Sequence, residues 1–234
     1  MLRVKFTKES YLKYISHLDL MRLFNRSFRR ANIPIKYTEG FNPQPKFSIA
    51  NPLALGIESV SEYMDIELEE EMPVEDFIVK MNAVLPGEIR ILEGEYIEEE
   101  KSLSSLVEMS HYEITFFYDE LEEADINELI SKWLQEENII VKRIRRKRGK
   151  IVEKEQNIRP LIGNIIVNSQ LPIHKGQLVE LNCLLKAGDR GNLKPTDFVE
   201  AMDKELNLNI DPDTVEIRRI GLYLADNGKI QLPI

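Results

Sequence analysis

The histidine at position 17 has the side chain best suited to acid–base chemistry in this sequence. Imidazole suits general acid–base work near neutral pH, and Tyr14, Ser16 and Asp19 lie near His17 along the chain. Such a group, together with cations that stabilise a phosphorane, is what metal-independent cleavage of RNA requires. The alternative is a helix-start residue that forms only local hydrogen bonds. We favour this alternative and a non-enzymatic protein, with catalysis by His17 kept open.

Four arginines share one face of the helix that is predicted to begin beside His17. Spacings of three and four residues place them away from the apolar side chains of Leu20, Phe24 and Phe28. Such a row is usually only a solvated surface, but acidic residues four positions away would then be expected beside the arginines. Binding of phosphate or of an acidic partner, and a plain solvated face, both stay open for Arg22, Arg26, Arg29 and Arg30.

The strongest electrostatic feature is the stretch from Lys142 to Lys150, in which seven of nine residues are basic. Like charges repel one another, and strand alternation would point some of them inward unless the predicted hairpin extends beyond its sheet. A projecting hairpin could follow a phosphate backbone, whereas the alternative is an exposed mobile loop that keeps an edge strand from aggregating. We favour nucleic-acid binding, with Arg159 adding to the surface formed by Lys142, Arg143, Arg145, Arg146, Lys147, Arg148 and Lys150.

The loop that follows the first helix is rich in glycine and proline. Pro43 and Pro45 fix φ and Gly40 permits a positive φ, so the sequence predicts a rigid shape. A rigid loop could present aromatic rings for stacking, whereas in the alternative both rings pack beneath the loop as core. The candidate loop surface comprises Tyr37, Phe41, Asn42 and Lys46.

The composition excludes several kinds of chemistry. The 234 residues carry a formal net charge of −9, which opposes general binding to nucleic acid or anionic membranes, although the charge is unevenly distributed. One cysteine, Cys183, and three histidines cannot form an iron–sulfur cluster within one chain, and the sequence has no phosphate-binding loop motif. It also lacks an apolar run long enough for a membrane span and a signal-peptide pattern. We therefore expect a cytoplasmic protein with no cofactor, no metal and no membrane partner.

Hydrophobic periodicity divides the chain into two halves with the same order of elements. The first half is predicted to contain strands at 2–7, 46–51, 62–69 and 90–96 and helices at 16–31 and 73–85. The second is predicted to contain strands at 111–118, 139–146, 151–155, 164–168, 178–185 and 215–223 and helices at 126–137 and 194–206. The order β-α-β-β-α-β predicts an α+β fold of two tandem ferredoxin-like domains, each an antiparallel sheet with its helices on one face. We place these domains at 1–100 and 106–234, the basic hairpin lying in the second. One larger α+β domain is the alternative.

Several short motifs resemble those of a bacterial domain family. They are Ile15-Ser16-His17-Leu18-Asp19, Phe28-Arg29-Arg30-Ala31, Gly40-Phe41-Asn42-Pro43 with Pro45-Lys46, Pro52-Leu53 and Leu55-Gly56. The family they resemble is that of the radical SAM-linked proteins, domains of unknown function, and the resemblance covers essentially the whole chain. It implies a partner rather than a reaction, since such a domain lies beside, or is fused to, a cobalamin-binding radical SAM protein. The family pattern has a histidine between the two loop prolines, where this chain has Gln44, so any role of that imidazole is lost here.

Three functions follow from these observations. The first, which we favour, is a non-catalytic RNA-binding or docking module that assists a radical SAM enzyme in RNA modification or processing. The second is a metal-independent endoribonuclease that uses His17. The third is a protein–protein scaffold whose basic hairpin meets an acidic partner.

Overall fold

The computed structural model describes residues 1–98, 101–119, 125–147, 150–173, 176–226 and 229–234, and the chain divides into two compact units. The first unit contains Met1–Ser110 and Arg218–Ile234, and the second contains His111–Ile217. The C-terminal segment thus joins the first unit, whereas the sequence assigned it to a domain at 106–234. The pairing explains this difference, because Arg218 and Arg219 lie opposite Glu58 and Ser59 of a first-unit strand.

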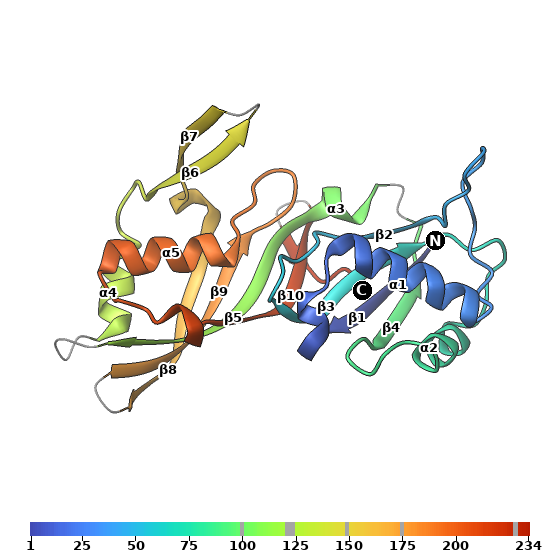
Figure 1. Cartoon of the computed structure of the whole chain (residues 1–234), viewed down its shortest axis with the longest axis horizontal. Coiled ribbons are helices and arrows are strands. Elements are labelled where there is room, and N and C mark those ends of the chain that lie inside the picture. The colour runs from blue at the N-terminus through green and yellow to red at the C-terminus, as the bar shows by residue number, and fades with distance from the viewer. Residues whose placement is uncertain (99–100, 120–124, 148–149, 174–175, 227–228) are drawn as a thin grey trace. The chain divides into compact units, whose positions relative to one another are not determined.

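The first unit combines helices with mostly antiparallel strands, which confirms the α+β class (Figure 1). Its strands are β1 (Leu2–Lys8), β2 (Phe47–Ile49), β3 (Glu58–Ile66), β4 (Ile91–Tyr96), most of β10 (Glu216–Asp226) and β11 (Lys229–Gln231). Its helices are the 3-10 helix η1 (Ser10–Tyr14), α1 (His17–Arg30), α2 (Val74–Asn82) and the short α3 (Leu103–Leu106). β1 pairs antiparallel with β3 and β4, and β2 pairs antiparallel with β3, while β10 runs parallel to β3.

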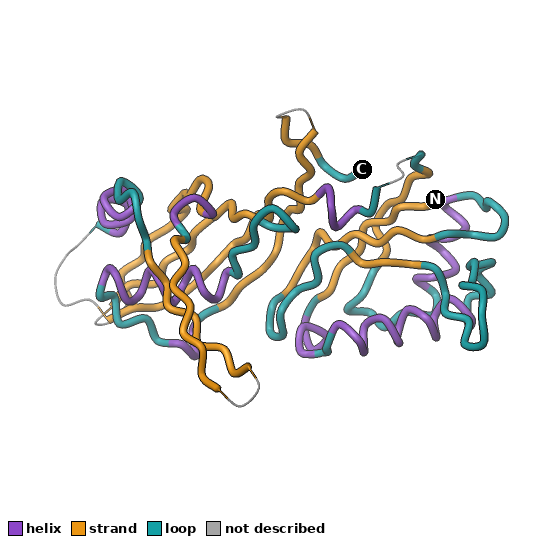
Figure 2. The backbone as a smooth tube through the Cα atoms, turned by 90° about the horizontal axis from the view of Figure 1, so that it is seen from above, coloured by secondary structure: helices purple, strands orange, loops and turns teal. Residues whose placement is uncertain are grey.

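The core of the first unit lies between its strands and the inner face of α1. Leu2, Val4 and Phe6 alternate along β1, so they share the face that packs on the apolar core, and all three are fully buried. Phe24 and Phe28 of α1 are equally buried, and the ring centroids of Phe6 and Phe24 lie 5.0 Å apart. Figure 2 shows α1 lying along one face of these strands. This packing decides which face of α1 is left to solvent.

The second unit contains most of β5 (Val107–Asp119), with β8 (Ile162–Ile173), β9 (Gly176–Lys186), α4 (Ile126–Trp133) and α5 (Pro195–Leu206). Its strand order is β5-β9-β8, and β8 pairs antiparallel with β9. The rings of Trp133 on α4 and Phe198 on α5 approach to 6.0 Å between centroids. Cys183 on β9 is buried, and burial raises the pKa of its thiol. Across the described ranges, no helix is long and apolar enough to cross a membrane.

The basic hairpin forms as predicted, but not within the sheet of its unit. β6 (Ile140–Lys147) and β7 (Lys150–Asn157) pair antiparallel as a separate two-stranded sheet, and Figures 1 and 2 show them extending away from β5, β8 and β9. A hairpin that extends beyond its sheet is the arrangement that binding by this stretch was predicted to require, and β8 and β9 pair in the sheet of the unit. The physical reason is that a packed strand buries alternate side chains, and so basic a stretch offers few that can be buried.

Candidate nucleic-acid interface

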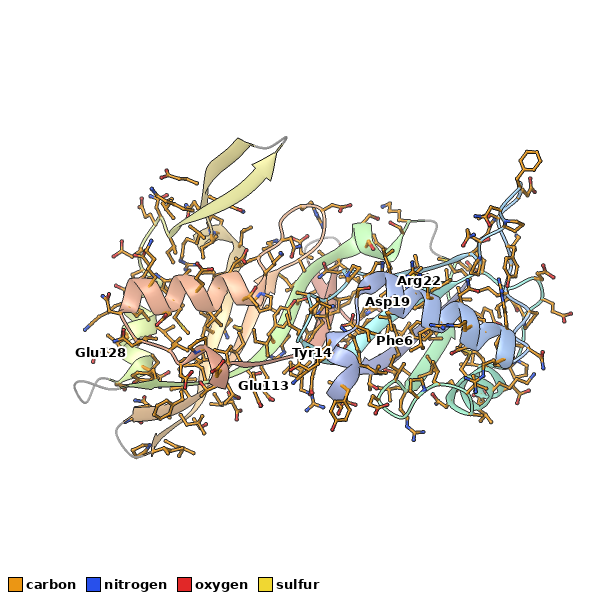
Figure 3. The ribbon with its side chains drawn as sticks, viewed as in Figure 1. Phe6, Tyr14, Asp19, Arg22, Glu113 and Glu128 are labelled. Carbon is orange, nitrogen blue, oxygen red and sulfur yellow. The ribbon has the colours of Figure 1, made fainter. Side chains whose placement is uncertain are left out.

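The arginine row, defined as Arg22, Arg26, Arg29 and Arg30, lies on the solvent face of α1. All four side chains are exposed, because Phe24 and Phe28 occupy the opposite face. Arg22 donates through Nη1 to Oδ1 of Asp19 at 2.9 Å, and Nε of Arg26 donates to the carbonyl of Arg22 at 3.3 Å. Figure 3 shows Asp19 and Arg22 close together on α1. The row therefore begins in a local ion pair and becomes more basic toward the C-terminal end of the helix.

The last turn of α1 carries two arginines whose charge is uncompensated. Arg29 and Arg30 are exposed, and in the part of the chain that the structure describes no carboxylate pairs with either guanidinium. The partial negative charge at a helix C-terminus stabilises cations there by about 0.3–1 kcal/mol, which accounts for a structural role. This interaction with the helix C-terminus leaves the five N–H donors of each guanidinium available. Their geometry suits bidentate binding of phosphate.

The N-terminus of α1 is capped by the side chain of Ser16. Oγ of Ser16 accepts a hydrogen bond from the backbone N–H of Asp19 at 3.1 Å and donates one to Oδ2 of Asp19 at 2.7 Å. The hydrogen bond from Ser16, followed by that from Arg22, lowers the pKa of the Asp19 carboxyl below its ordinary value of 3.8. This network fixes where the row of arginines begins.

Replacing Ser16 with alanine is expected to lower the free energy of unfolding by about 1 kcal/mol, because the cap is lost. It should also raise the pKa of Asp19 toward 3.8, which an NMR titration of the side chain measures. Since the folded pKa is lowered, the contribution of Asp19 to stability is present above its unfolded pKa and disappears as the pH falls through the folded pKa. Ser16→Thr keeps the hydroxyl and serves as the control. An unchanged pKa of Asp19 in Ser16→Ala would contradict the assigned cause.

His17 is the first residue of α1, and its side chain is exposed. Among the described residues, no hydroxyl, carboxylate or carbonyl forms a hydrogen bond that orients its imidazole. A general base needs a proton within hydrogen-bond reach and, in most sites, a third group that holds the ring. His17 therefore lies at a helix start, as the alternative predicted, but its side chain lacks the expected local hydrogen bonds within the described ranges, and no contact there supports catalysis.

Large exposed apolar side chains lie around the start of α1, and they were not predicted from the sequence. Tyr11, Tyr14, Leu18 and Leu55 are 81%, 65%, 65% and 61% exposed, and we call them the aromatic patch. Tyr11 and Tyr14 come from η1, and a β-carbon added to Gly56 would lie 3.8 Å from Cε1 of Tyr14. Large apolar side chains that gather on a surface commonly mark an interaction site. The only signal in the sequence is the three-residue spacing of the two tyrosines, which a 3-10 helix places on one side.

Buried charges lie beneath the aromatic patch. Nη1 of Arg219 donates to Oε1 of Glu62 and to the carbonyl of Asn51, both at 2.9 Å, and Arg219 and Glu62 are almost fully buried. Lys8 is also buried, and its Nζ donates to the carbonyl of Lys13 in η1 at 3.3 Å. Burial lowers the pKa of Lys8, while the nearby carboxylate of Glu62 acts in the opposite direction. These charges connect β1, β3 and β10 to the backbone of η1.

Further contacts hold the backbone of η1 in place. Glu9, which precedes η1, accepts from Nη2 of Arg218 at 2.6 Å. Glu58 accepts from the backbone N–H of Ser10 at 3.1 Å and pairs with Nζ of Lys13 at 3.6 Å. The carbonyl of Lys13 also accepts from the backbone N–H of Gly56 at 2.9 Å. The exposed tyrosines therefore stand on a backbone that is fixed from several sides.

The two predicted stacking residues in the loop between α1 and β2 differ in their exposure to solvent. Phe41 is fully exposed, whereas Tyr37 is half-buried against the core of the first unit, so a stacking role for Tyr37 is not supported. Thr38 and Gln44 hold the loop closed through a backbone hydrogen bond of 2.8 Å. The exposed Asn42 accepts from Nε2 of Gln44 through its carbonyl at 3.4 Å. Nζ of the fourth candidate, Lys46, pairs with Oε2 of Glu67 at 3.3 Å.

The structure describes the side chains of only some of the candidate residues in the basic hairpin. Nζ of Lys142 lies 3.5 Å from Oε1 of Glu155, its partner across the strands. Of the other candidates, Arg148 lies outside the described residues, and only the backbone is described for Arg143, Arg145, Arg146, Lys147 and Lys150. Arg159 does not extend this surface, because its Nε donates to the carbonyl of Leu134 at 2.8 Å and its Nη1 to that of Ile162 at 3.2 Å. It closes the C-terminal end of α4 instead.

The chain belongs to the family described as an uncharacterized protein conserved in bacteria, DUF2344, which it matches over residues 1–195. No curated protein matches the sequence.

Two solved structures are similar to this chain at low sequence identity, and only the first of them supports a shared fold. The chain is similar to one in the crystal structure of a Cbf5-Nop10-Gar1 complex, with 13% identity and a TM-score of 0.50 over 93% of this chain and 47% of that one. It is also similar to a chain in the structure of an H/ACA RNP bound to a substrate RNA containing 2'-deoxyuridine, with 11% identity and a TM-score of 0.46 over 93% and 46%. The chain spans about half the length of these proteins. Such identities show the fold alone.

Proposed function

We propose that this protein is a non-catalytic RNA-binding module that assists a radical SAM enzyme in RNA modification or processing. The observation that carries the proposal is the exposed arginine row of α1, with Arg29 and Arg30 free of acidic partners within the described ranges. The chain as a whole has a formal net charge of −9, whereas this row is basic. The local charge governs the encounter with a polyanion.

The basic hairpin is the second element of this proposal. Its two strands extend from the second unit without packing in the sheet of that unit, which suits a segment that follows a phosphate backbone. Arg159 is left out of the proposed surface because backbone carbonyls bind its guanidinium.

A radical SAM partner and a ferredoxin-like arrangement of each half are also part of the proposal. The motif resemblance to radical SAM-linked proteins supports a radical SAM partner in the cytoplasm, and a chain with one cysteine could assist such an enzyme but not hold its cluster. The antiparallel order β4-β1-β3-β2 in the first unit supports a ferredoxin-like arrangement, which we propose for both halves with the hairpin as an insertion in the second.

Arg29→Glu/Arg30→Glu is expected to weaken RNA binding at least tenfold at low salt and to flatten its salt dependence. Each lost phosphate contact lowers the slope of log K against log salt by about 1. Filter binding with transfer RNA and ribosomal RNA at two or more salt concentrations measures both quantities. Arg145→Ala/Arg146→Ala tests the hairpin in the same assay, with a smaller loss expected because the charges are removed and not reversed.

The matched control is Lys80→Glu/Arg90→Glu, which changes the net charge by the same amount at exposed positions of the same unit. It should bind RNA with nearly the affinity of the unmodified protein. The proposal would be contradicted by RNA binding that does not depend on salt, or by equal losses of RNA affinity in the control and in Arg29→Glu/Arg30→Glu.

A further inference from the structure

We infer that the aromatic patch and the arginine row form one site for single-stranded RNA, in which unpaired bases stack on Tyr11 and Tyr14 and the backbone follows α1. This inference rests on the proposed RNA binding and adds the class of RNA. Duplex RNA hides its base faces inside the helix, whereas a single strand can turn its bases onto tyrosine rings.

The chemistry of the patch suits bases flanked by phosphates. Tyr11 and Tyr14 expose most of their side chains, and Nζ of Lys13 lies 5.5 Å from the ring centroid of Tyr14, within range of a cation–π interaction. Since this ammonium also pairs with Glu58, the rings offer surfaces for bases, and the phosphate contacts are assigned to the arginine row. Two carboxylates that hold η1 are bound to cations, since Glu9 pairs with Arg218 and Glu58 with Lys13.

The backbone that carries the two tyrosines of the aromatic patch is also held in place by the protein's own contacts. A surface loop can usually let its aromatic side chains collapse onto the core, but here the backbone of η1 is fixed. The carbonyl of Lys13 accepts from the buried Lys8 at 3.3 Å and from the backbone N–H of Gly56 at 2.9 Å. Ser10 stands at a positive φ of 52°, which its backbone hydrogen bond to Glu58 supports. A fixed backbone reduces the entropy lost when a ligand binds, so exposed rings on it are suited to recognition.

The patch leads directly into the arginine row. Leu18 belongs to the patch and lies one turn before Arg22 on the exposed face of α1, and Arg26 and Arg29 follow at four and three residues. The 14 residues of α1 extend about 21 Å, enough for several nucleotides. Stacking groups therefore stand at the N-terminal end of the helix, and uncompensated cations stand at the other. This combination favours a nucleic-acid strand over an apolar protein surface.

Tyr11→Ala/Tyr14→Ala is the test, with a short single-stranded uridine oligonucleotide and a duplex of equal length as probes in fluorescence anisotropy. We expect single-strand affinity to fall about tenfold for each tyrosine, with an unchanged salt slope and unchanged duplex affinity. Tyr11→Phe/Tyr14→Phe should bind as the unmodified protein does, because phenylalanine stacks equally well. Leu92→Ala/Val79→Ala removes exposed apolar groups elsewhere in the unit and should have no effect.

The outcomes separate this inference from the function on which it rests. If Arg29→Glu/Arg30→Glu loses single-strand binding while Tyr11→Ala/Tyr14→Ala keeps it, RNA binding stands and the stacking site is refuted. Equal losses for single strand and duplex also refute it. If the unmodified protein binds neither probe, both proposals fail; loss of a protein partner by the tyrosine variant would then assign the patch to a protein interface.

Discussion

Replacing Glu62 with alanine is expected to lower the free energy of unfolding by about 3–5 kcal/mol, as measured by urea unfolding followed by circular dichroism. Glu62 and Arg219 are almost fully buried, and their ion pair joins Oε1 to Nη1 at 2.9 Å. Removing the carboxylate takes the counter-charge of Glu62 away from Arg219, and it takes away from Lys8, also buried, the group that opposes its desolvation. An unpaired buried charge is strongly destabilising even where the intact pair contributes little.

Glu93→Ala is the matched control for this prediction. Glu93 pairs with Lys5 at 3.0 Å on the adjacent strand, but its side chain is about half exposed. Solvent screens such a pair, so its loss should change stability by about 0–1 kcal/mol. Equal effects of the two substitutions would show that the buried charges beneath the aromatic patch do not stabilise the fold.

Glu62→Gln adds a pH test with a defined sign. Burial already lowers the pKa of Lys8 below 10.5, and losing the carboxylate of Glu62 should lower it further. Between the lowered folded pKa and 10.5 the unfolded chain binds more protons, so stability rises with pH in that interval. Glu62→Gln should therefore gain more stability than the unmodified protein when the pH is raised from 7 toward 10.

The local elements of this chain could be predicted because their signals are local. The cap formed by Ser16 and Asp19, followed by Leu20, Phe24 and Phe28 at helical spacing, defines α1 and its solvent face without tertiary information. The hairpin of β6 and β7 was also visible as a pair of strands. A hairpin that extends beyond the sheet was also foreseen, but the strands that pair in the sheet in its place were not, because pairing partners are chosen by packing.

The candidate site was predicted only where exposure follows from helical periodicity. Phe41 and Tyr37 stand four residues apart in one loop, yet one is exposed and the other packs on the core, a difference that depends on tertiary contacts. Glu62 and Arg219 are separated by 157 positions, so no local pattern could indicate their pairing. The aromatic patch was missed for the same reason, since the contacts that hold η1 come from distant strands.

Phe24→Ala is expected to destabilise the protein by about 3–5 kcal/mol, an effect as large as that of Glu62→Ala. Phe24 is fully buried at the centre of an aromatic cluster, with ring centroids of Phe6, Phe28 and Phe47 at 5.0, 6.1 and 6.5 Å. Alanine would leave a cavity where α1 meets the strands. Phe41→Ala, the same change at a fully exposed position, should shift stability by less than about 0.5 kcal/mol in the same urea titration.

The same variant tests whether α1 binds RNA through its surface alone. Phe24 lies on the opposite face of the helix from Arg22, Arg29 and the rest of the arginine row, so its loss should not alter any phosphate contact directly. Under conditions where Phe24→Ala remains folded, its RNA affinity and salt slope should therefore equal those of the unmodified protein. Affinity should fall only in proportion to the folded fraction as denaturant or temperature increases. A folded Phe24→Ala protein that fails to bind RNA would mean that the position of α1 on the sheet, and not only its charge, determines binding.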